Sequence, residues 1–185
     1  MEKLDDRSAR RNHRRYERGL SRAPQEPIDA HTFREAMSRL GAAVHVVTTD
    51  GPGGKAGFTA TAVCSVSDEP PTLLVCLNRR SQITPVLQRN GILCINTLAA
   101  DQSIIAEVFA GRTGRFMEHR FDTGAWSVLK SGSPVLQSAI VALDCRIIEV
   151  KAVATHNILF AVVEDIRQRP HGPALIYHDR AYKRI

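Results

Sequence analysis

Strand-like segments follow one another along most of this chain and do not alternate regularly with helices. Runs rich in apolar and β-branched residues, bounded by turn residues, are typical of strands. They span 42–50, 56–67, 72–78, 92–98, 138–155, 156–169 and 174–185. A parallel sheet would need a long crossover, usually a helix, after nearly every strand. The order of segments therefore predicts a mainly β protein, an antiparallel barrel with short helices at its margins.

Three segments have helical patterns. In the segment 29–41, Phe33, Met37 and Leu40 recur at helical spacing, and either Asp29 or Thr32 is placed to cap the first turn. Two shorter helices are predicted over 81–91, beginning at Ser81, and over 101–111, with Asp101 as the N-cap. The stretch 112–136 has neither periodicity and is expected to be a loop that folds over something.

The formal net charge of +6 is concentrated at the N-terminus, where the segment 8–19 reads SARRNHRRYERG. Residues 1–27 have almost no apolar periodicity, which indicates a flexible basic extension ahead of one domain at 28–185. A basic arm binds nucleic acid by neutralising phosphates. No base-reading motif accompanies this arm, so we do not expect nucleic acid to be the partner.

Several other classes of protein are disfavoured by composition. No apolar run approaches the length of about 18 residues that a membrane span requires, and the N-terminus has no secretory h-region. The four cysteines stand singly, with neither a CxxC pair nor a histidine at metal spacing, so no metal site is predicted. Buried free thiols in a cytoplasmic protein are the expected state.

The segment AGFTATAVCSVSDEPP (56–71) contains an unusual strand. Its residues Thr59, Ala60, Thr61 and Ala62 stand where a packed sheet usually has larger β-branched side chains. Small side chains leave the backbone open to a flat ring, whose edge can bond main-chain N–H groups and hydroxyls. A lightly packed edge strand would have the same composition, and composition alone leaves both interpretations open.

One hairpin further on, a second segment has the residue types of a phosphate site. The strand 72–78 ends in Asn78, Arg79 and Arg80, and Ser81 follows where a helix is predicted to begin. Guanidinium groups, a hydroxyl and a helix N-terminus together suit a phosphate, although the same residues also serve as a cap and a solvated surface. Flat-ring strand and phosphate site lie close in sequence, as flavin mononucleotide (FMN) requires.

Six segments, one of which contains the two just described, extend this pattern over the chain from about residue 31 to 185. They read FREAMSRLGAAVHVVTTDG, GFTATAVCSVSDEPPTLLVCLNRRS, LCINTL, FAGRTGRFMEHRF, ATHNILFAVVEDI and LIYHDRAYKRI. In these segments the chain resembles the short-chain flavin reductase family. The resemblance implies an FMN-binding split β-barrel with antiparallel strands in Greek-key order, and a homodimer.

The resemblance also implies an activity and a set of residues. The activity is NAD(P)H-dependent reduction of FMN or FAD, with the reduced flavin diffusing to a flavin-dependent monooxygenase. The motifs assign four groups of residues. The flavin ring would contact Thr59, Ala60, Thr61 and Ala62, the flavin phosphate would contact Asn78, Arg79, Ser81 and Thr84, and the other side of the flavin would be closed by Phe109, Ala110 and Gly111. His156 would lie near the nicotinamide, and the flavin pocket would be bordered by Tyr177, Arg180 and Tyr182.

Some alternatives stay open at the level of sequence. Ala154 stands where the family motif begins with glycine, and either arginine of the pair 79–80 is placed to face the phosphate. The charged trio at 118–120 fits a surface cluster or part of a lid, and Trp126 is expected to anchor packing. A flavin-binding module that carries or senses FMN without turnover is the alternative function, because one fold hosts several functions. The choice between NADH and NADPH is also open.

Overall fold

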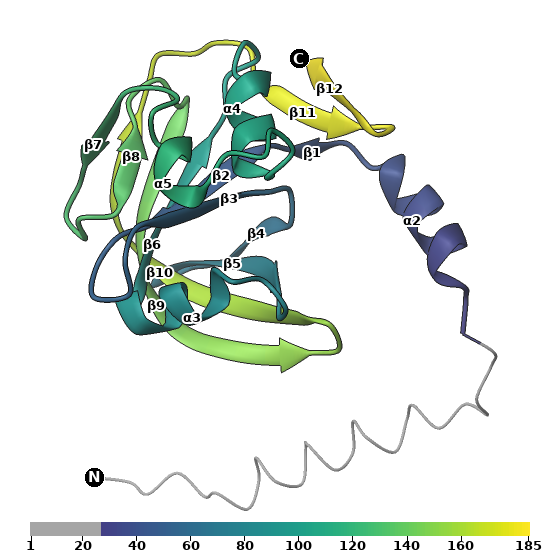
Figure 1. Cartoon of the computed structure of the whole chain (residues 1–185), viewed down its shortest axis with the longest axis horizontal. Helices are drawn as coiled ribbons and strands as arrows, with labels where there is room; N and C mark the ends of the chain where they lie inside the picture. The colour runs from purple at the N-terminus through teal and green to yellow at the C-terminus, as the bar shows by residue number, and fades with distance from the viewer. Residues whose placement is uncertain (1–26) are drawn as a thin grey trace, which may run out of the picture. The chain divides into compact units, whose positions relative to one another are not determined.

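A computed structural model describes residues 27–185, and most of its strands form one antiparallel sheet (Figure 1). Seven strands lie side by side in the order β3-β2-β6-β9-β10-β5-β4. Their bounds are β3 (Ala56–Ala60), β2 (His45–Thr49), β6 (Ile92–Thr97), β9 (Val141–Val153), β10 (His156–Gln168), β5 (Pro71–Asn78) and β4 (Val63–Asp68). The predicted mainly β, antiparallel architecture is confirmed, although the sheet does not close, because β3 and β4 remain its two edges.

Two small sheets complete the strands. One has the order β1-β11-β12, with β1 (Ala42–Ala43), β11 (Leu175–His178) and β12 (Ala181–Arg184); the other pairs β7 (Trp126–Val128) with β8 (Pro134–Leu136). The single strand predicted over 174–185 is therefore a hairpin. Its two turn residues, Asp179 and Arg180, have φ angles of 51° and 59°, which reverse the chain between β11 and β12.

The strand predicted over 56–67 is broken at Thr61 and Ala62, the two residues between β3 and β4. β3 pairs only with β2, and β4 pairs only with β5, so the chain passes at this point from one edge of the sheet to the other. Edge strands leave main-chain N–H and C=O groups without ladder partners. The segment that we predicted to bind a flat ring therefore connects the two edge strands of the sheet.

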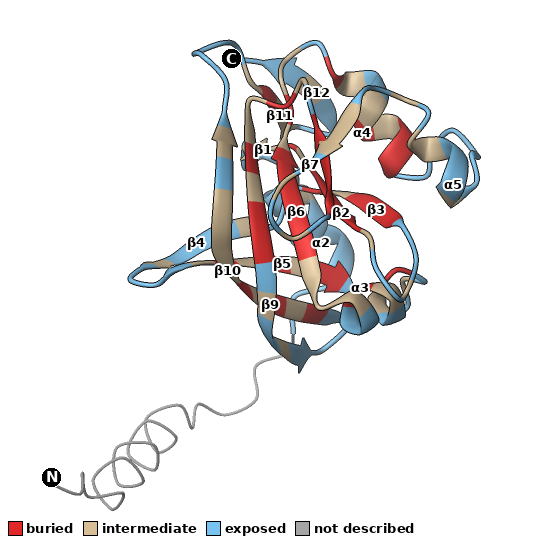
Figure 2. Cartoon of the chain, turned by 90° about the vertical axis from the view of Figure 1, so that its left-hand side faces the viewer, coloured by how far each residue is buried: buried red, intermediate tan, exposed pale blue. Residues whose placement is uncertain are grey.

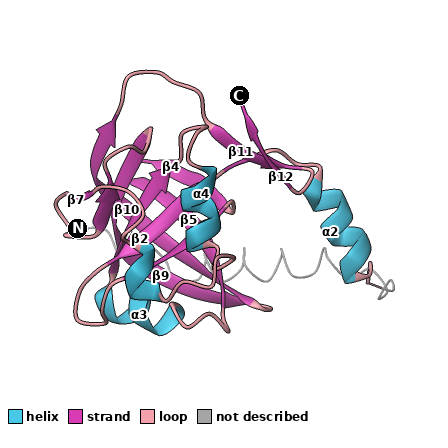
Figure 3. Ribbon diagram, turned by 45° about the horizontal axis from the view of Figure 1, so that its top comes forward, coloured by secondary structure: helices cyan, strands magenta, loops and turns pink. Residues whose placement is uncertain are grey.

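The described residues also form short helices (Figure 3), with bounds α2 (Ala30–Ser38), α3 (Thr84–Asn90), α4 (Ser103–Phe109) and α5 (Met117–Arg120). Asp29 caps α2: its carboxylate accepts the N–H groups of His31 and Thr32 at 2.8 and 3.0 Å and the Thr32 hydroxyl, and this hydroxyl bond is the main reason that the pKa of Asp29 is lowered. The prediction of Asp101 as a cap was wrong, because Gln102 holds the N-cap position of α4.

The buried side chains form a core on both faces of the central strands. In Figure 2 the ribbon is coloured as buried along parts of β2, β6 and β9. On one face, Phe109, Phe121 and Trp126 pack as a triad with ring centroids 5.1 to 5.5 Å apart, so Trp126 is a packing anchor as predicted. Gly57 allows this packing, because a Cβ there would lie 2.8 Å from the Phe109 ring.

The cysteines are free thiols, but only two of them are buried. Burial raises the pKa of the Cys145 thiol to about 12 and raises that of Cys94, so both stay protonated. Cys64 is exposed, which corrects the expectation of four buried thiols. Within residues 27–185, no helix is long and apolar enough to cross a membrane. The predicted basic extension lies, except for Pro27, outside the described residues.

Candidate active site

The break between β3 and β4 is fastened to the end of β5 by a main-chain hydrogen bond. The N–H of Cys76 donates to the carbonyl of Ala62 at 3.1 Å. Thr61 and Ala62 themselves are exposed. Since Cys76 lies two residues before Asn78, this bond brings the proposed ring-binding segment to the strand whose end carries the proposed phosphate residues.

In β3, the main chain of the free edge is available for hydrogen bonds, whereas the side chains of Thr59 and Ala60 contact the protein. The Thr59 hydroxyl donates to the carbonyl of Ala106 in α4 at 2.7 Å, and the Ala60 side chain is buried in the core. Gly57 turns its N–H outward to the Met117 sulfur at 3.4 Å. Because ladder bonds alternate along an antiparallel strand, Thr59 turns its N–H to the same outer side. This edge therefore offers a main-chain donor, and only Thr61 and Ala62 expose their side chains.

The turn after β5 is built around Asn78. Its side-chain oxygen accepts the N–H of Arg80 at 2.9 Å, and its carbonyl accepts the N–H of Ser81 at 3.0 Å and the hydroxyl of Thr84 at 3.3 Å. The helix α3 begins at Thr84, three residues later than predicted, with Ile83 at the N-cap. Ser81 is thus a turn residue, and its hydroxyl accepts the N–H of Ile83 at 3.3 Å.

His156 lies directly across the sheet from Asn78, as its partner in the β5–β10 ladder. The two residues before it, Ala154 and Thr155, form a turn that contacts Arg79, the residue after the end of β5. The Arg79 N–H donates to the Thr155 carbonyl at 3.0 Å, and the Arg79 guanidinium donates to the Ala154 carbonyl at 3.3 Å. Ala154 has a φ of 47°, a left-handed conformation that glycine adopts more easily. The turn is therefore tight although alanine replaces the glycine of the family motif. The two hydrogen bonds from Arg79 stabilise this conformation.

The loop after α4 is fixed by one arginine. Arg120 donates to the carbonyls of Phe109 and Arg115, both at 3.3 Å, and its guanidinium lies where a Cβ on Gly111 would approach within 3.2 Å. Gly111 has a φ of 77°, so this position favours glycine for two reasons. The Phe109 side chain is in the core, whereas Ala110 and Gly111 are exposed. Arg120 therefore positions the loop, a role that the sequence left open.

Tyr177 and Tyr182 form a separate group with the end of α4. Their rings lie 5.4 Å apart, and a hydrogen bond from Arg112 to Tyr177, followed by the charge of Glu107, raises the pKa of that arginine. Burial raises the pKa of Tyr182. The contacts just described connect these tyrosines to α4 and not to the Asn78 turn, so their place, with Arg180, in the same pocket stays a prediction.

Sequence reasoning missed His45. It pairs with Ala60 across β2 and β3 and with Thr97 across β2 and β6, and its Nδ1 lies 3.0 Å from the Thr97 hydroxyl. Burial lowers the pKa of His45 from 6.5 to about 4, so the ring is neutral at pH 7. The register of the hairpin around the turn DGPGGK would have placed it opposite the predicted ring-binding strand.

The lowered pKa of His45 predicts a specific acid sensitivity. Below pH 6.5 the unfolded chain takes up a proton at this residue, whereas the folded chain does not until about pH 4. The free energy of unfolding should therefore fall by up to about 1.4 kcal/mol per pH unit across this window. Urea unfolding at pH 7, 6 and 5 measures this fall, and a His45→Asn variant, which cannot titrate, should lose it. Parallel curves for the parent and the variant would contradict the assignment.

The family of the chain follows from a comparison with known proteins. The model of the flavin reductase like domain matches residues 37–185, which include the Ala62–Cys76 connection, the Asn78 turn and His156. The chain belongs to the flavin reductase-like family. The resemblance inferred from the sequence is thereby confirmed, and with it the prediction of a flavin oxidoreductase.

Individual members agree with this assignment. The flavin reductase-like chain is 52% identical over 159 residues to an NADH-dependent FMN reductase, RutF, of Methylorubrum populi (86% of this chain, 78% of that one) and 51% identical over 155 residues to the RutF of Escherichia coli (84% and 93%). A crystal structure of a putative flavin reductase from Haemophilus somnus superimposes with a TM-score of 0.82 at 44% identity (85% and 100%). BorF, the flavin reductase component of a bacterial two-component tryptophan halogenase, gives 0.79 at 26% (85% and 98%).

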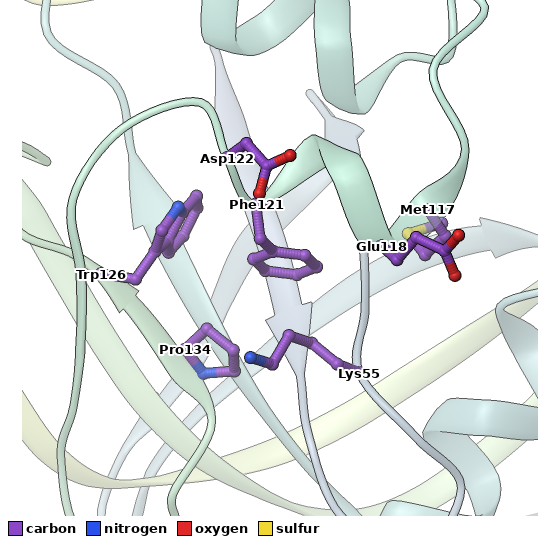
Figure 4. Close-up of a pocket in the computed structure, with 7 residues that line it drawn as sticks. All are labelled: Lys55, Met117, Glu118, Phe121, Asp122, Trp126 and Pro134. Carbon is purple, nitrogen blue, oxygen red and sulfur yellow. The ribbon is translucent and has the colours of Figure 1, made fainter.

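A hollow in the flavin reductase-like domain lies beside the start of β3, with a volume of about 650 Å³ (Figure 4). Its lining residues are Lys55, Met117, Glu118, Phe121, Asp122, Trp126 and Pro134. Lys55 places its ammonium group 5.5 Å from the centre of the Phe121 ring. None of the residues predicted for the flavin lines it. Among the described residues, no cluster of three or more His, Cys, Asp or Glu side chains is arranged to hold a metal ion.

Proposed function

We propose that this chain reduces FMN with NADH at the break between β3 and β4 and releases the reduced flavin to a partner enzyme. The observation that carries the proposal is the connection of three separate motifs. The Cys76–Ala62 hydrogen bond joins the ring-binding segment to β5, and the β5–β10 ladder places His156 opposite Asn78. The names of both curated relatives, FMN reductase (NADH), support the choice of cofactor and co-substrate.

The residues at the break fit a flat cofactor with one phosphate. Thr61 and Ala62 are exposed and small, and Thr59 offers a main-chain N–H at the open edge, so a ring can lie on the backbone without displacing packed side chains. Ser81 and Thr84 carry hydroxyl groups on the Asn78 turn, where they are placed to hold the phosphate.

The bound flavin supplies the chemistry by accepting a hydride from the nicotinamide ring. The protein then has to bind both rings, orient them and keep water out, so no paired carboxylates or nucleophile are needed. His156 is exposed at the start of β10, with its Nδ1 2.9 Å from the Thr155 hydroxyl. This bond fixes the ring orientation, and Nε2 remains to position the carboxamide of the nicotinamide.

Replacing His156 should separate the binding of the two substrates. A His156→Ala variant is expected to raise the KM for NADH about tenfold, the effect of one lost hydrogen bond at the substrate, and to leave the dissociation constant of FMN within twofold. Steady-state NADH oxidation and flavin fluorescence titration measure the two quantities. His119→Ala, at an exposed histidine of α5, is the matched control. Unchanged kinetics in His156→Ala would remove this residue from the site.

The activity itself is tested by anaerobic NADH oxidation with FMN, FAD or riboflavin. We expect stoichiometric bleaching of flavin absorbance, with FMN preferred over riboflavin because the Asn78 turn binds a phosphate. FMN binding without NADH oxidation would instead establish the alternative, a flavin carrier or sensor on the same fold. No binding of any flavin would exclude both functions.

The recipient of the reduced flavin is, in this proposal, a flavin-dependent monooxygenase. BorF, 26% identical to this chain, serves as the reductase component of a two-component halogenase, which supports a separate recipient protein. Transfer by diffusion predicts that product formation by such a monooxygenase survives when a dialysis membrane separates the two proteins. Product formation only on direct mixing would exclude diffusion.

We also propose that this protein is a homodimer and is located in the cytoplasm. Within α2, Phe33 and Met37 lie one helical turn apart and form an apolar stripe along the helix. An apolar stripe of this kind is typical of a surface that another chain covers. Light scattering should give a mass near twice 20.4 kDa, and a Phe33→Glu, Met37→Glu variant should shift it toward the monomer. Equal masses for the two proteins would exclude α2 from the interface.

A further inference from the structure

The hollow of about 650 Å³ beside the start of β3 is separate from the proposed flavin site, because none of the residues assigned to the flavin or to the nicotinamide lines it (Figure 4). Four of its lining side chains are apolar or aromatic: Met117, Phe121, Trp126 and Pro134. Phe121 and Trp126 are held in place, since their ring centroids lie 5.2 Å apart and both rings pack on the buried Phe109. A hollow of this volume with aromatic walls is typical of a site for a small molecule that carries a ring.

One lining residue of this hollow is positively charged. Lys55 places its ammonium group 5.5 Å from the centre of the Phe121 ring and pairs with the carboxylate of Asp50 at the long distance of 3.7 Å. An ammonium group has three N–H donors, so this contact leaves donors of Lys55 available to a ligand. The hollow therefore offers a cation to an acidic group of a ligand.

Two carboxylates also line the hollow, one from Glu118 in α5 and one from Asp122, two residues beyond α5. Both lie beside His119, at 3.7 and 3.3 Å, and each keeps further capacity to accept hydrogen bonds. Together with Lys55, the lining carries charges of both signs. An anion would meet the two carboxylates and a cation would meet the ammonium group, whereas a zwitterion matches both signs.

We propose that this hollow binds a free α-amino acid with an aromatic side chain. The ring of the ligand lies against Phe121 and Trp126, its carboxylate accepts from Lys55, and its ammonium group donates to the carboxylates of Glu118 and Asp122. No residue of the proposed flavin site takes part. The inference therefore goes beyond the proposed function and does not depend on it.

Binding can be measured at the site itself, because Trp126 lines the hollow and is the single tryptophan of the chain. Titration of the full chain with phenylalanine, without added flavin, should change the tryptophan fluorescence saturably, and calorimetry should give the same dissociation constant. Three probes each lack one group: hydrocinnamate lacks the ammonium group, phenethylamine lacks the carboxylate, and alanine lacks the ring. The first two should bind about fivefold more weakly than phenylalanine, the effect of one exposed ion pair, and alanine at least about tenfold more weakly.

Variants assign each end of the ligand. Lys55→Gln should weaken the binding of phenylalanine about fivefold and should not weaken that of phenethylamine, which has no carboxylate. Lys55→Arg, which keeps the charge, should retain most of the affinity. The double variant Glu118→Gln, Asp122→Asn should weaken the binding of phenylalanine and not that of hydrocinnamate. Lys151→Gln is the matched control, because it removes the same charge from an exposed position of β9 outside the hollow.

Three results would overturn the proposal. If phenylalanine bound no more tightly than hydrocinnamate or phenethylamine, one charge of the zwitterion would play no part. If Lys55→Gln and Lys151→Gln lost the same affinity, the effect would not come from the hollow. The third is the lack of a saturable signal in both fluorescence and calorimetry. NADH oxidation with FMN by the same preparation measures the proposed function separately, so failure of one proposal is distinguishable from failure of the other.

Discussion

An Ala62→Phe variant should fold like the parent and bind FMN at least about 100-fold more weakly. Ala62 is exposed, so the larger side chain meets no packed core. It would, however, cover the main chain between β3 and β4, where we propose that the flavin ring lies. A 100-fold loss corresponds to about 2.7 kcal/mol, a modest figure for a ring that loses its contact surface. Fluorescence titration with FMN, together with a thermal unfolding curve, measures both parts of the prediction.

The matched control for this variant is Val128→Phe, which enlarges an exposed strand residue of β7. It should leave both the FMN affinity and the melting temperature unchanged. Full FMN affinity in Ala62→Phe would mean that the ring lies elsewhere, and the ring-binding segment would then be an ordinary pair of edge strands.

A Phe109→Ala variant should lose about 3 to 5 kcal/mol of folding free energy. Only 1% of the Phe109 surface is accessible, and the ring packs on Phe121 and Trp126. Its removal leaves a cavity beside Gly57. The ring packs so closely on β3 that a Cβ at Gly57 would lie 2.8 Å from it. Urea unfolding followed by tryptophan fluorescence measures the loss, because Trp126 is the single tryptophan and lies in the triad.

Phe116→Ala serves as the comparison, since 76% of the Phe116 surface is accessible. Its effect should stay within about 0.5 kcal/mol of the parent. Similar losses in the two variants would contradict the packing described for the triad. If Phe109→Ala kept the parent's stability but lost FMN affinity, the aromatic ring would belong to the ligand site, as the family resemblance alone suggests.

Parts of the site were predictable from the sequence because they are local. The strand end at Asn78 with its following turn is encoded within seven residues, and the small residues of 59–62 are visible in the composition of one segment. The hairpin at 50–55 fixes a register, so the position of His45 opposite Ala60 was also within reach. Turn residues and short-range periodicity carry this kind of information.

Other features depend on contacts between distant segments. The break at Thr61 and Ala62 is not visible as a turn signal, because it forms where β3 and β4 leave for opposite edges of the sheet and Cys76 bonds Ala62. In the same way, Arg120 fixes the loop after α4 through carbonyl groups up to eleven residues away.

The sequence by itself determined that this chain forms antiparallel strands, that one of them carries small residues, and that arginines and hydroxyls follow the next. The tertiary structure alone decided that Phe109 is a core residue, that Ala154 adopts a left-handed turn, and that His156 stands across from Asn78. The physical reason is the range of the forces involved. Backbone preference acts within a few residues, whereas burial and ladder pairing depend on which distant strands come into contact.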